Sequence, residues 1–180
     1  TGYFGVIAVI ALIFGIKDYY EQSKIKTVLS MTVVNSMAND TETPEQKIKE
    51  TLGYKDDPYS KVEIGVNLTT DSEMAEFDYN AQMAYVAQIQ AGSIDIMVMP
   101  EKLYQTLKKN EPFADLKELM GEEAFEKFGM QTDTTHISIT DSELEQELGV
   151  IYDPVCIAVP YSALNQENAV KWIKSLDSRK

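Results

Sequence analysis

Residues 1–16 read TGYFGVIAVIALIFGI and contain no charged side chain; the first charged residue is Lys17. Such a run of aromatic, β-branched and small residues is costly to expose to water and favourable to place in lipid. A membrane-spanning helix needs about 20 apolar residues, so this run falls slightly short. Because the chain starts with Thr1, we expect it to begin inside a longer span. The sequence therefore predicts a transmembrane helix and a juxtamembrane segment over residues 1–23.

Three other kinds of apolar amino terminus fit less well. A cleaved signal peptide needs a small-x-small cleavage site, and none precedes Lys17. A lipoprotein signal needs a cysteine directly after the apolar run, whereas Cys156 is the only cysteine. A pilin-like helix carries an early glutamate that is missing here. A helix buried in a globular core is the remaining alternative to a membrane anchor.

The charge of the chain excludes one class of partner. Its net charge is −13, from 29 acidic and 16 basic residues, and residues 1–16 contribute none of it. Such a domain repels nucleic acid and anionic lipid surfaces, so we expect no DNA or RNA partner. Long acidic domains cross membranes regardless of their charge, and we place residues 24–180 outside the cytoplasm. One cysteine allows no intrachain disulfide, so a single ordinary core must stabilise this part.

After the apolar run, strand and helix patterns alternate. Strand-like runs cover residues 26–35, 62–68, 94–99, 136–140 and 155–159, and helical patterns cover 43–53, 71–91, 100–107, 113–128, 142–149 and 165–176. The runs IDIMVM and VCIAV are almost continuously apolar, which is typical of strands buried on both faces of a parallel sheet. The pattern predicts a single α/β lobe of three layers with a mostly parallel sheet.

One predicted helix is free of charge. Residues 79–94 read YNAQMAYVAQIQAGSI and hold four side-chain amides, which exclude a membrane span. Small alanines suit close packing on a sheet, while Tyr85, Val86 and Ile89 occupy a different arc. This arc either packs against neighbouring helices within the domain or forms an interface with a partner or a second copy of the chain.

The middle and the end of the chain carry a family resemblance. The run AGSID at 91–95, the strand IMVM at 96–99 and the turn PFADL at 112–116 resemble type-2 extracellular solute-binding proteins of ABC transporters. In that family a helix ends in an aagxxD pattern, and an apolar strand, a short helix and a g-x-f-x-dL turn follow. The tail NAVKWIKSL at 168–176 is similar to the closing helix of the family. The order also resembles membrane-anchored, solute-binding-like proteins of Gram-positive bacteria, in which a single span replaces the lipid anchor.

The chain departs from that family in size. Its members usually have two lobes that grip a ligand between them, but fewer than forty residues separate Leu116 from Val155. This length is too short for a second lobe. The resemblance therefore implies one lobe with a small insert, in which a small ligand is harder to enclose.

Ligands of open α/β sheets bind outside the carboxyl ends of the strands. The side chains that follow the predicted strands are therefore the candidate ligand-binding residues: Asn35, Ser36, Thr70, Asp71, Glu101, Tyr161 and Ser162. Helix amino termini at this edge suit an anionic or polar group. The alternative role of each of these residues is to cap a helix or form a turn.

Catalytic and metal signals are few. The one histidine, His136, has no nucleophile nearby in the sequence, and we expect it to be structural or exposed to solvent. Cys156 lies within an apolar strand and should behave as a small hydrophobic residue. One histidine and one cysteine give no zinc spacing, and the acidic pairs lack the calcium-loop pattern. We expect no cofactor, no metal and no enzymatic activity.

Three functions remain as hypotheses. The first is a single-pass, membrane-tethered, solute-binding-like ectodomain that serves as an accessory or receptor subunit beside a transporter permease or another membrane protein. The second is a ligand-free interaction or scaffold module that forms oligomers or docks on a membrane partner. The third, an extracellular hydrolase, has only His136 and the acidic pairs in its favour.

Overall fold

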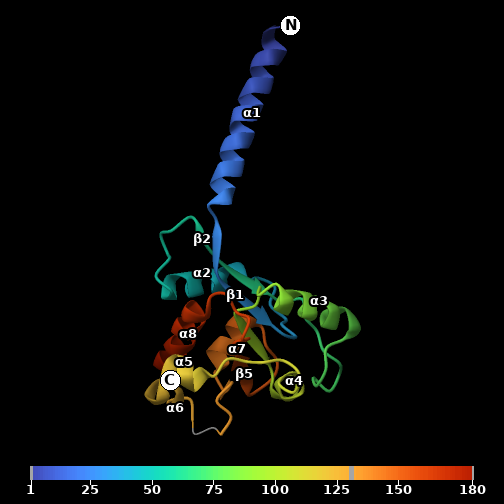
Figure 1. Cartoon of the computed structure of the whole chain (residues 1–180), viewed down its shortest axis with the longest axis vertical. Coiled ribbons are helices and arrows are strands. Elements are labelled where there is room, and N and C mark those ends of the chain that lie inside the picture. The colour runs from blue at the N-terminus through green and yellow to red at the C-terminus, as the bar shows by residue number, and fades with distance from the viewer. Residues whose placement is uncertain (1, 130–131, 180) are drawn as a thin grey trace.

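The computed structural model describes residues 2–129 and 132–179, and a long N-terminal helix projects from an α/β domain (Figure 1). The helices and strands follow in this order: α1 (Gly2–Ser23), β1 (Lys26–Val33), α2 (Glu42–Thr51), β2 (Ser60–Gly65), α3 (Tyr79–Gln90), β3 (Ile96–Pro100), α4 (Glu101–Leu107), α5 (Leu116–Met120), α6 (Glu122–Glu126), β4 (Ile137–Ile139), α7 (Ser142–Leu148), β5 (Val155–Ala158), α8 (Gln166–Ser175) and the 3₁₀ helix η1 (Leu176–Arg179). The predicted α/β class is confirmed.

Within the described residues, five strands form one mixed sheet in the order β2-β1-β3-β5-β4. Strand β1 pairs in parallel with β2 and with β3. Strand β5 runs antiparallel to both of its neighbours, β3 and β4. The expectation of a mostly parallel sheet is therefore met in part: β1, β2, β3 and β4 run in one direction, and β5 runs in the opposite direction.

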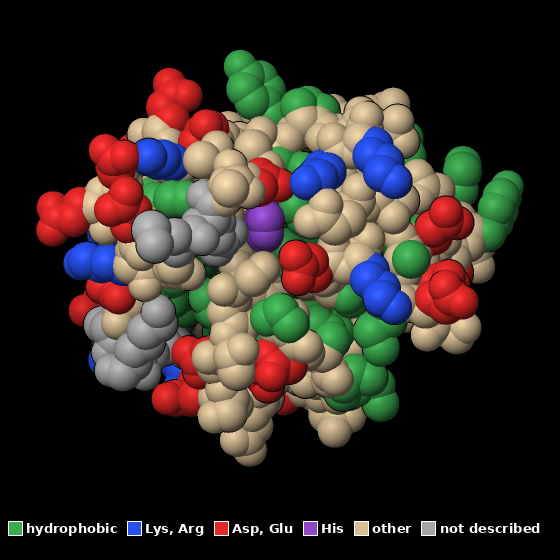
Figure 2. All heavy atoms as spheres, turned by 90° about the horizontal axis from the view of Figure 1, so that it is seen from below, with side chains coloured by type: hydrophobic (Ala, Val, Ile, Leu, Met, Phe, Trp, Pro, Cys, Tyr) green, Lys and Arg blue, Asp and Glu red, His purple; other side chains and the backbone are tan. Residues whose placement is uncertain are grey.

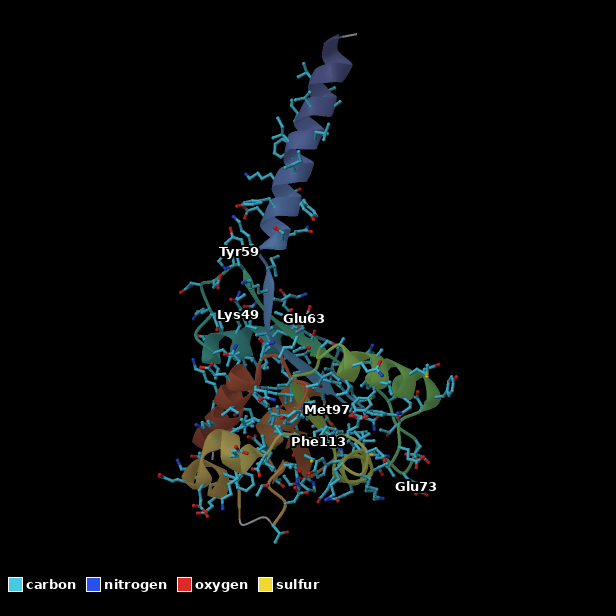
Figure 3. All side chains as sticks on the ribbon, in the orientation of Figure 1. Lys49, Tyr59, Glu63, Glu73, Met97 and Phe113 are labelled. Carbon is cyan, nitrogen blue, oxygen red and sulfur yellow. The ribbon has the colours of Figure 1, made fainter. Side chains whose placement is uncertain are left out.

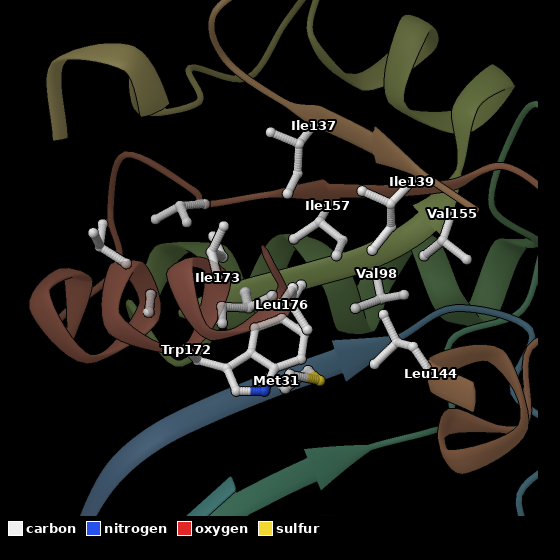
Figure 4. Packing of buried hydrophobic residues seen from close by; sticks show 14 of the residues in the cluster. Met31, Val98, Ile137, Ile139, Leu144, Val155, Ile157, Trp172, Ile173 and Leu176 are labelled. Atoms are coloured by element: carbon white, nitrogen blue, oxygen red, sulfur yellow. The ribbon is translucent and has the colours of Figure 1, made fainter. Parts of the chain in front are cut away.

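The first hydrophobic core lies between one face of the sheet and the helices α2, α5, α6, α7 and α8. Met31, Val98 and Ile157 reach it from three neighbouring strands, and Trp172 of α8 packs among them (Figure 4). Trp172 is almost fully buried and is the largest side chain of this core. Removing so much apolar surface from water is the main favourable term in folding.

The second core lies on the opposite face of the sheet, under α3 and α4. Met97 and Met99 of β3 point into it, together with Phe113 and Cys156. Ile96 and Val98 point into the first core. Successive residues of a strand face opposite sides of a sheet. The apolar runs around β3 and β5 therefore fill both cores, as their sequences predicted; Figure 3 marks Met97 and Phe113 in the interior.

The helix predicted for residues 71–91 is shorter in the structure. Helix α3 begins only at Tyr79, after Asp78, whose side chain accepts a hydrogen bond from the backbone N–H of Ala81. Before it, the Asp71 carboxylate accepts hydrogen bonds from the backbone N–H groups of Ala75 and Glu76. Asp71 therefore forms a turn rather than capping a helix, because its side chain competes for the N–H groups of the following loop.

The helix predicted for residues 113–128 is also divided. Its apolar residues do reach the first core, but Gly121, with a φ of 87°, separates α5 from α6. This backbone conformation is outside the helical range and is readily adopted only by glycine. Both short helices bury their apolar residues in the first core. The spacing of these residues therefore does not reveal that the helix is broken at Gly121.

Helix α1 meets the domain only at its C-terminal end in the contacts described. The Tyr59 hydroxyl donates a 2.7 Å hydrogen bond to Glu21, and the Lys24 ammonium lies 5.3 Å from the centre of the Tyr59 ring (Figure 3). Among the described residues, no helix combines the length and the apolar character needed to cross a membrane.

Candidate polar site beside β4

Two of the predicted rim positions are in direct contact. The Asn35 side-chain amide donates a 2.7 Å hydrogen bond to the Thr70 hydroxyl, and the Thr70 backbone N–H donates to Asn35 Oδ1 at 3.0 Å. The ends of β1 and β2 do bring these residues together, as expected for parallel neighbours. Their polar atoms bind one another, which is the turn-forming role that the sequence left open.

Ser36 and Glu101 lie apart from this pair in their contacts. The Ser36 hydroxyl donates a 2.7 Å hydrogen bond to the backbone carbonyl of Leu148 and so connects the end of β1 to α7. Glu101 begins α4 and lines a hollow whose other wall comes from β4 and the loop before it. Of the predicted ligand-binding residues, Glu101 alone lines this hollow.

Tyr161 and Ser162 lie at the opposite edge of the sheet from the other predicted residues. The prediction assumed that β5 runs parallel to β3, but the two strands are antiparallel. The segment after β5 therefore lies near the start of β3: a Cβ added to Gly92 would meet the Ser162 carbonyl oxygen at 2.9 Å. A single site that combines Tyr161 or Ser162 with Glu101 is not formed.

The predicted interface arc of α3 is divided between the core and the surface. Tyr85 is 1% exposed, and its ring packs against Phe77 with 4.9 Å between centroids. Ile89 is partly buried against the second core, whereas Val86 is 37% exposed. Tyr85 is thus a core residue and offers no free surface. The large exposed apolar side chains of α3 are instead Tyr79, Met83 and Val86.

A hollow lined mainly by polar side chains has a volume of about 590 Å³ and opens to solvent between α4 and β4. Its lining residues are Glu101, Gln105, Lys108, Phe128, Thr132, Asp133, His136 and Ser138. In the space-filling view from below, the histidine is visible on this face, with acidic and basic side chains beside it (Figure 2). The hollow lies beside the outer strand of the sheet rather than above the carboxyl ends of β1 and β2.

The alternation of β4 explains why polar groups lie here. Ile137 and Ile139 point into the first core, so His136 and Ser138 face the other side of the sheet. On that side α4 buries Leu103 and Tyr104 over the neighbouring strands. Helix α4 thus covers the neighbouring strands but not β4. His136 and Ser138 of this region therefore form a polar wall of the hollow.

Asp133 is held by four donors. Its Oδ1 accepts hydrogen bonds from the backbone N–H and the hydroxyl of Thr135, at 3.0 and 2.7 Å. Its Oδ2 accepts from the Tyr104 hydroxyl at 2.9 Å and from the Lys108 ammonium at 3.0 Å. Burial alone would raise the pKa of Asp133, but these donors together hold it well below its usual value. Asp133 is therefore a fixed carboxylate paired with Lys108.

His136 and Ser138 keep unused polar atoms in the wall of the hollow. His136 is 6% exposed, and burial lowers the pKa of its imidazole, so the neutral form is favoured at pH 7. Its Nδ1 lies 3.4 Å from Asp133 Oδ2 in a geometry that makes no hydrogen bond. The Ser138 hydroxyl oxygen is buried and has no hydrogen-bond partner among the described residues. Buried polar atoms of this kind are costly unless a ligand or water satisfies them.

Asp133, His136 and Ser138 are the residue types of a nucleophilic triad, but they are not arranged as one. A triad requires the hydroxyl of the nucleophile to donate to the imidazole, and Ser138 makes no such hydrogen bond. The described residues also contain no group of three or more histidine, cysteine, aspartate or glutamate side chains suited to a metal ion.

The sequence contained one signal for this hollow that its interpretation missed. The run HISIT alternates at period two, which places His136 and Ser138 on one face and two isoleucines on the other. His136 was expected to be structural or exposed, and it is buried in the wall of the hollow. No sequence motif connects Lys108 with Asp133. Their ion pair could therefore be found only in the structure.

Comparisons with protein-family models, with curated proteins and with solved structures found no match to this chain.

Proposed function

We propose that this chain is a membrane-tethered, solute-binding-like ectodomain that serves as an accessory or receptor subunit beside a membrane partner such as a transporter permease. In this proposal α1 is embedded in lipid, and the α/β domain stands outside the cytoplasm, close to the bilayer surface. The observation that carries the proposal is the exposure of apolar side chains on every side of α1.

Helix α1 has exposed apolar side chains around its whole circumference. The large apolar side chains between Val6 and Ile16 are 47% to 64% exposed, and they occur on all sides of the helix. A helix that packs on its own domain has one apolar stripe and one polar face, whereas a helix that is apolar all round requires an apolar environment on all sides. The domain covers none of these side chains, and lipid would cover all of them.

The connection between α1 and the domain suits this arrangement. Charged and aromatic side chains gather at the end of the apolar part, where Tyr20 lies under the Lys24 ammonium at 4.4 Å from its ring centre. Tyrosine and lysine side chains are favoured at the boundary between lipid and water. The first strand begins at Lys26, so only a very short linker separates the proposed lipid-embedded helix from the sheet.

The receptor part of the proposal is supported by the polar hollow beside β4. Its volume of about 590 Å³ is within the range of small-ligand pockets, and buried polar atoms line it. It is open on one side, as expected for one lobe without an opposing lobe. Binding there should be weaker than in a two-lobed clamp, because less of the ligand is removed from water.

The tether is tested by flotation of the full chain with vesicles of neutral phosphatidylcholine. The double variant Ile10→Lys/Ile13→Lys should lose flotation, because each lysine costs about 3 kcal/mol at the centre of a membrane helix. The control Gln22→Lys/Ser23→Lys adds the same charge beyond the apolar residues and should float like the wild type. Equal flotation of both variants, or a wild type that stays in the aqueous fraction, would refute the tether.

The exposed stripe of α3 favours a second candidate function, a module that forms oligomers. Tyr79 is 81% exposed and Met83 is 61% exposed, and no charged residue interrupts α3. In a chain of net charge −13, this is a surface on which two copies can approach without direct repulsion. Light scattering of detergent-solubilised wild type and Met83→Glu would show a larger mass for the wild type alone if this candidate is right.

A further inference from the structure

We propose that the hollow between α4 and β4 binds a small organic cation that carries a primary ammonium group. The proposal deepens the receptor role proposed above, on which it rests for its setting in the membrane. It is carried by the polar groups that line the hollow and remain unused by the fold.

The first of these groups is the Glu101 carboxylate. Within the residues that the structure describes, Glu101 forms no ion pair and no side-chain hydrogen bond, although it lines the hollow. Asp133, the other carboxylate of the hollow, is already bound by Lys108 and three further donors. Glu101 is therefore the negative charge left free for a ligand.

A hydroxyl in the wall complements this carboxylate. The Ser138 hydroxyl oxygen is buried and has no hydrogen-bond partner among the described residues. A hydroxyl oxygen accepts hydrogen bonds, and a primary ammonium group has three N–H donors that it can share between Glu101 and Ser138. His136 Nδ1 lies 3.4 Å from the Asp133 carboxylate, which favours the neutral tautomer with the proton on Nδ1, so this nitrogen is no acceptor for the ligand.

The charge of the hollow selects the sign of the ligand. Lys108 and Asp133 neutralise each other through a 3.0 Å ion pair. His136 is predominantly neutral at pH 7, because burial lowers the pKa of its imidazole. Glu101 then leaves the hollow with one net negative charge, inside a chain of net charge −13. An anionic ligand would be repelled, and a cation would be attracted.

An organic ammonium fits better than a metal ion. The described residues offer no cluster of three ligating side chains for a metal. The hollow is also much larger than a bare ion, at about 590 Å³. Gln105 lines the wall next to Glu101 on α4 and makes no side-chain hydrogen bond with the described residues, so it can bind a second polar group of the ligand.

Isothermal titration calorimetry of the detergent-solubilised full chain tests the proposal. The probe is 1,4-diaminobutane at pH 7.5 and about 0.15 M salt, which screens attraction to the distant surface charges. The comparators are 1,4-butanediol, which has the same length without charge, and glutarate, which is an anion. We expect saturable binding of the diamine and no binding of the diol or of glutarate.

Two variants identify the site. Glu101→Gln keeps the size of the side chain and removes its charge, and it should weaken binding at least about tenfold, which corresponds to about 1.4 kcal/mol. Glu118→Gln removes an exposed carboxylate on α5 as a matched control and should bind like the wild type. Ser138→Ala, which deletes a single hydroxyl, should also weaken binding without changing the net charge.

Absence of diamine binding, equal binding of the diol, or equal effects of Glu101→Gln and Glu118→Gln would overturn the proposal. The last result would show that only the overall negative charge attracts the diamine. None of these results bears on flotation with neutral vesicles, so failure of the ligand site and failure of the membrane tether can be distinguished.

Discussion

The carboxylate of Asp95 and the side chain of Asn165 connect the start of β3 to the start of α8. Asp95 accepts 2.9 Å hydrogen bonds from both the backbone N–H and the side-chain amide of Asn165. It also accepts a 2.8 Å hydrogen bond from the backbone N–H of Ser30 in β1. Asp95 is 1% exposed, so one buried carboxylate satisfies three donors from two distant parts of the chain.

Replacing Asp95 should therefore destabilise the domain strongly. Asp95→Ala leaves three donors without an acceptor, and each buried unsatisfied group costs about 1–3 kcal/mol. We expect a loss of about 3 kcal/mol or more in the free energy of unfolding, measured by urea denaturation. Asp56→Ala removes an exposed aspartate and should change this free energy by less than about 0.5 kcal/mol. Similar values for the two variants would show that the Asp95 network is unimportant.

Gly149 follows α7 with a φ of 64°, and it lies against Ala38. A Cβ added to Gly149 would lie 2.3 Å from the backbone nitrogen of Ala38, which cannot move aside easily. Gly149→Ala should cost more than the 1–3 kcal/mol typical of backbone strain alone. Gly121→Ala provides the matched control, because Gly121 also has a positive φ but has open space around its Cβ position. Thermal unfolding should place Gly149→Ala well below Gly121→Ala, and equal midpoints would contradict this account.

The neighbouring residues Tyr85 and Val86 should respond oppositely to lysine. Tyr85→Lys would bury an unpaired ammonium in the second core, and we expect a loss of about 4 kcal/mol or more. Val86→Lys places the same charge on the exposed side of α3, with an expected effect of about 0.5 kcal/mol or less. Circular dichroism and urea denaturation measure both. A folded, stable Tyr85→Lys would show that Tyr85 is not in the core.

The stability of the domain should depend on His136 near neutral pH. Burial lowers the pKa of His136 below its unfolded value of about 6.5, and the opposing effects of Asp133 and Glu101 do not compensate. The unfolded chain therefore binds a proton before the folded chain does. Stability from neutral His136 is fully present above pH 6.5 and is lost as the pH falls below it, by at most about 1.4 kcal/mol per pH unit. Denaturation midpoints of wild type and His136→Gln between pH 5 and 7.5 measure this, and an equal pH dependence of the two proteins would refute it.

Simple sequence patterns predicted the elements that fill the two cores. The strands around Met97 and Cys156 could be located because their apolar runs are buried on both faces, and the helix around Trp172 because its apolar residues recur at helical spacing. The direction of β5 could not be predicted, because an apolar strand reads the same in either direction. That one reversal moved Tyr161 and Ser162 away from the predicted site.

Local polar chemistry explains most of the remaining differences. Asp71 and Asp78 are both good capping residues by type, and only the structure shows that Asp78 begins α3. Asp95 belongs to the family-like run AGSID, but its three donors come from Ser30 and Asn165, far away in the sequence. The hollow beside β4 likewise depends on contacts between α4 and residues more than twenty positions later.

The position of Ile10 relative to lipid tests the central claim most directly. Cys156 is fully buried, and burial raises the pKa of its thiol, so a Cys introduced by Ile10→Cys would be the one reactive thiol for a bimane label. Met37→Cys provides a control on the domain, where Met37 is exposed. In phosphatidylcholine vesicles with brominated acyl chains, we predict strong quenching of the label at position 10 and none at position 37. Equal fluorescence of the position-10 label with and without bromine would contradict a helix embedded in the bilayer.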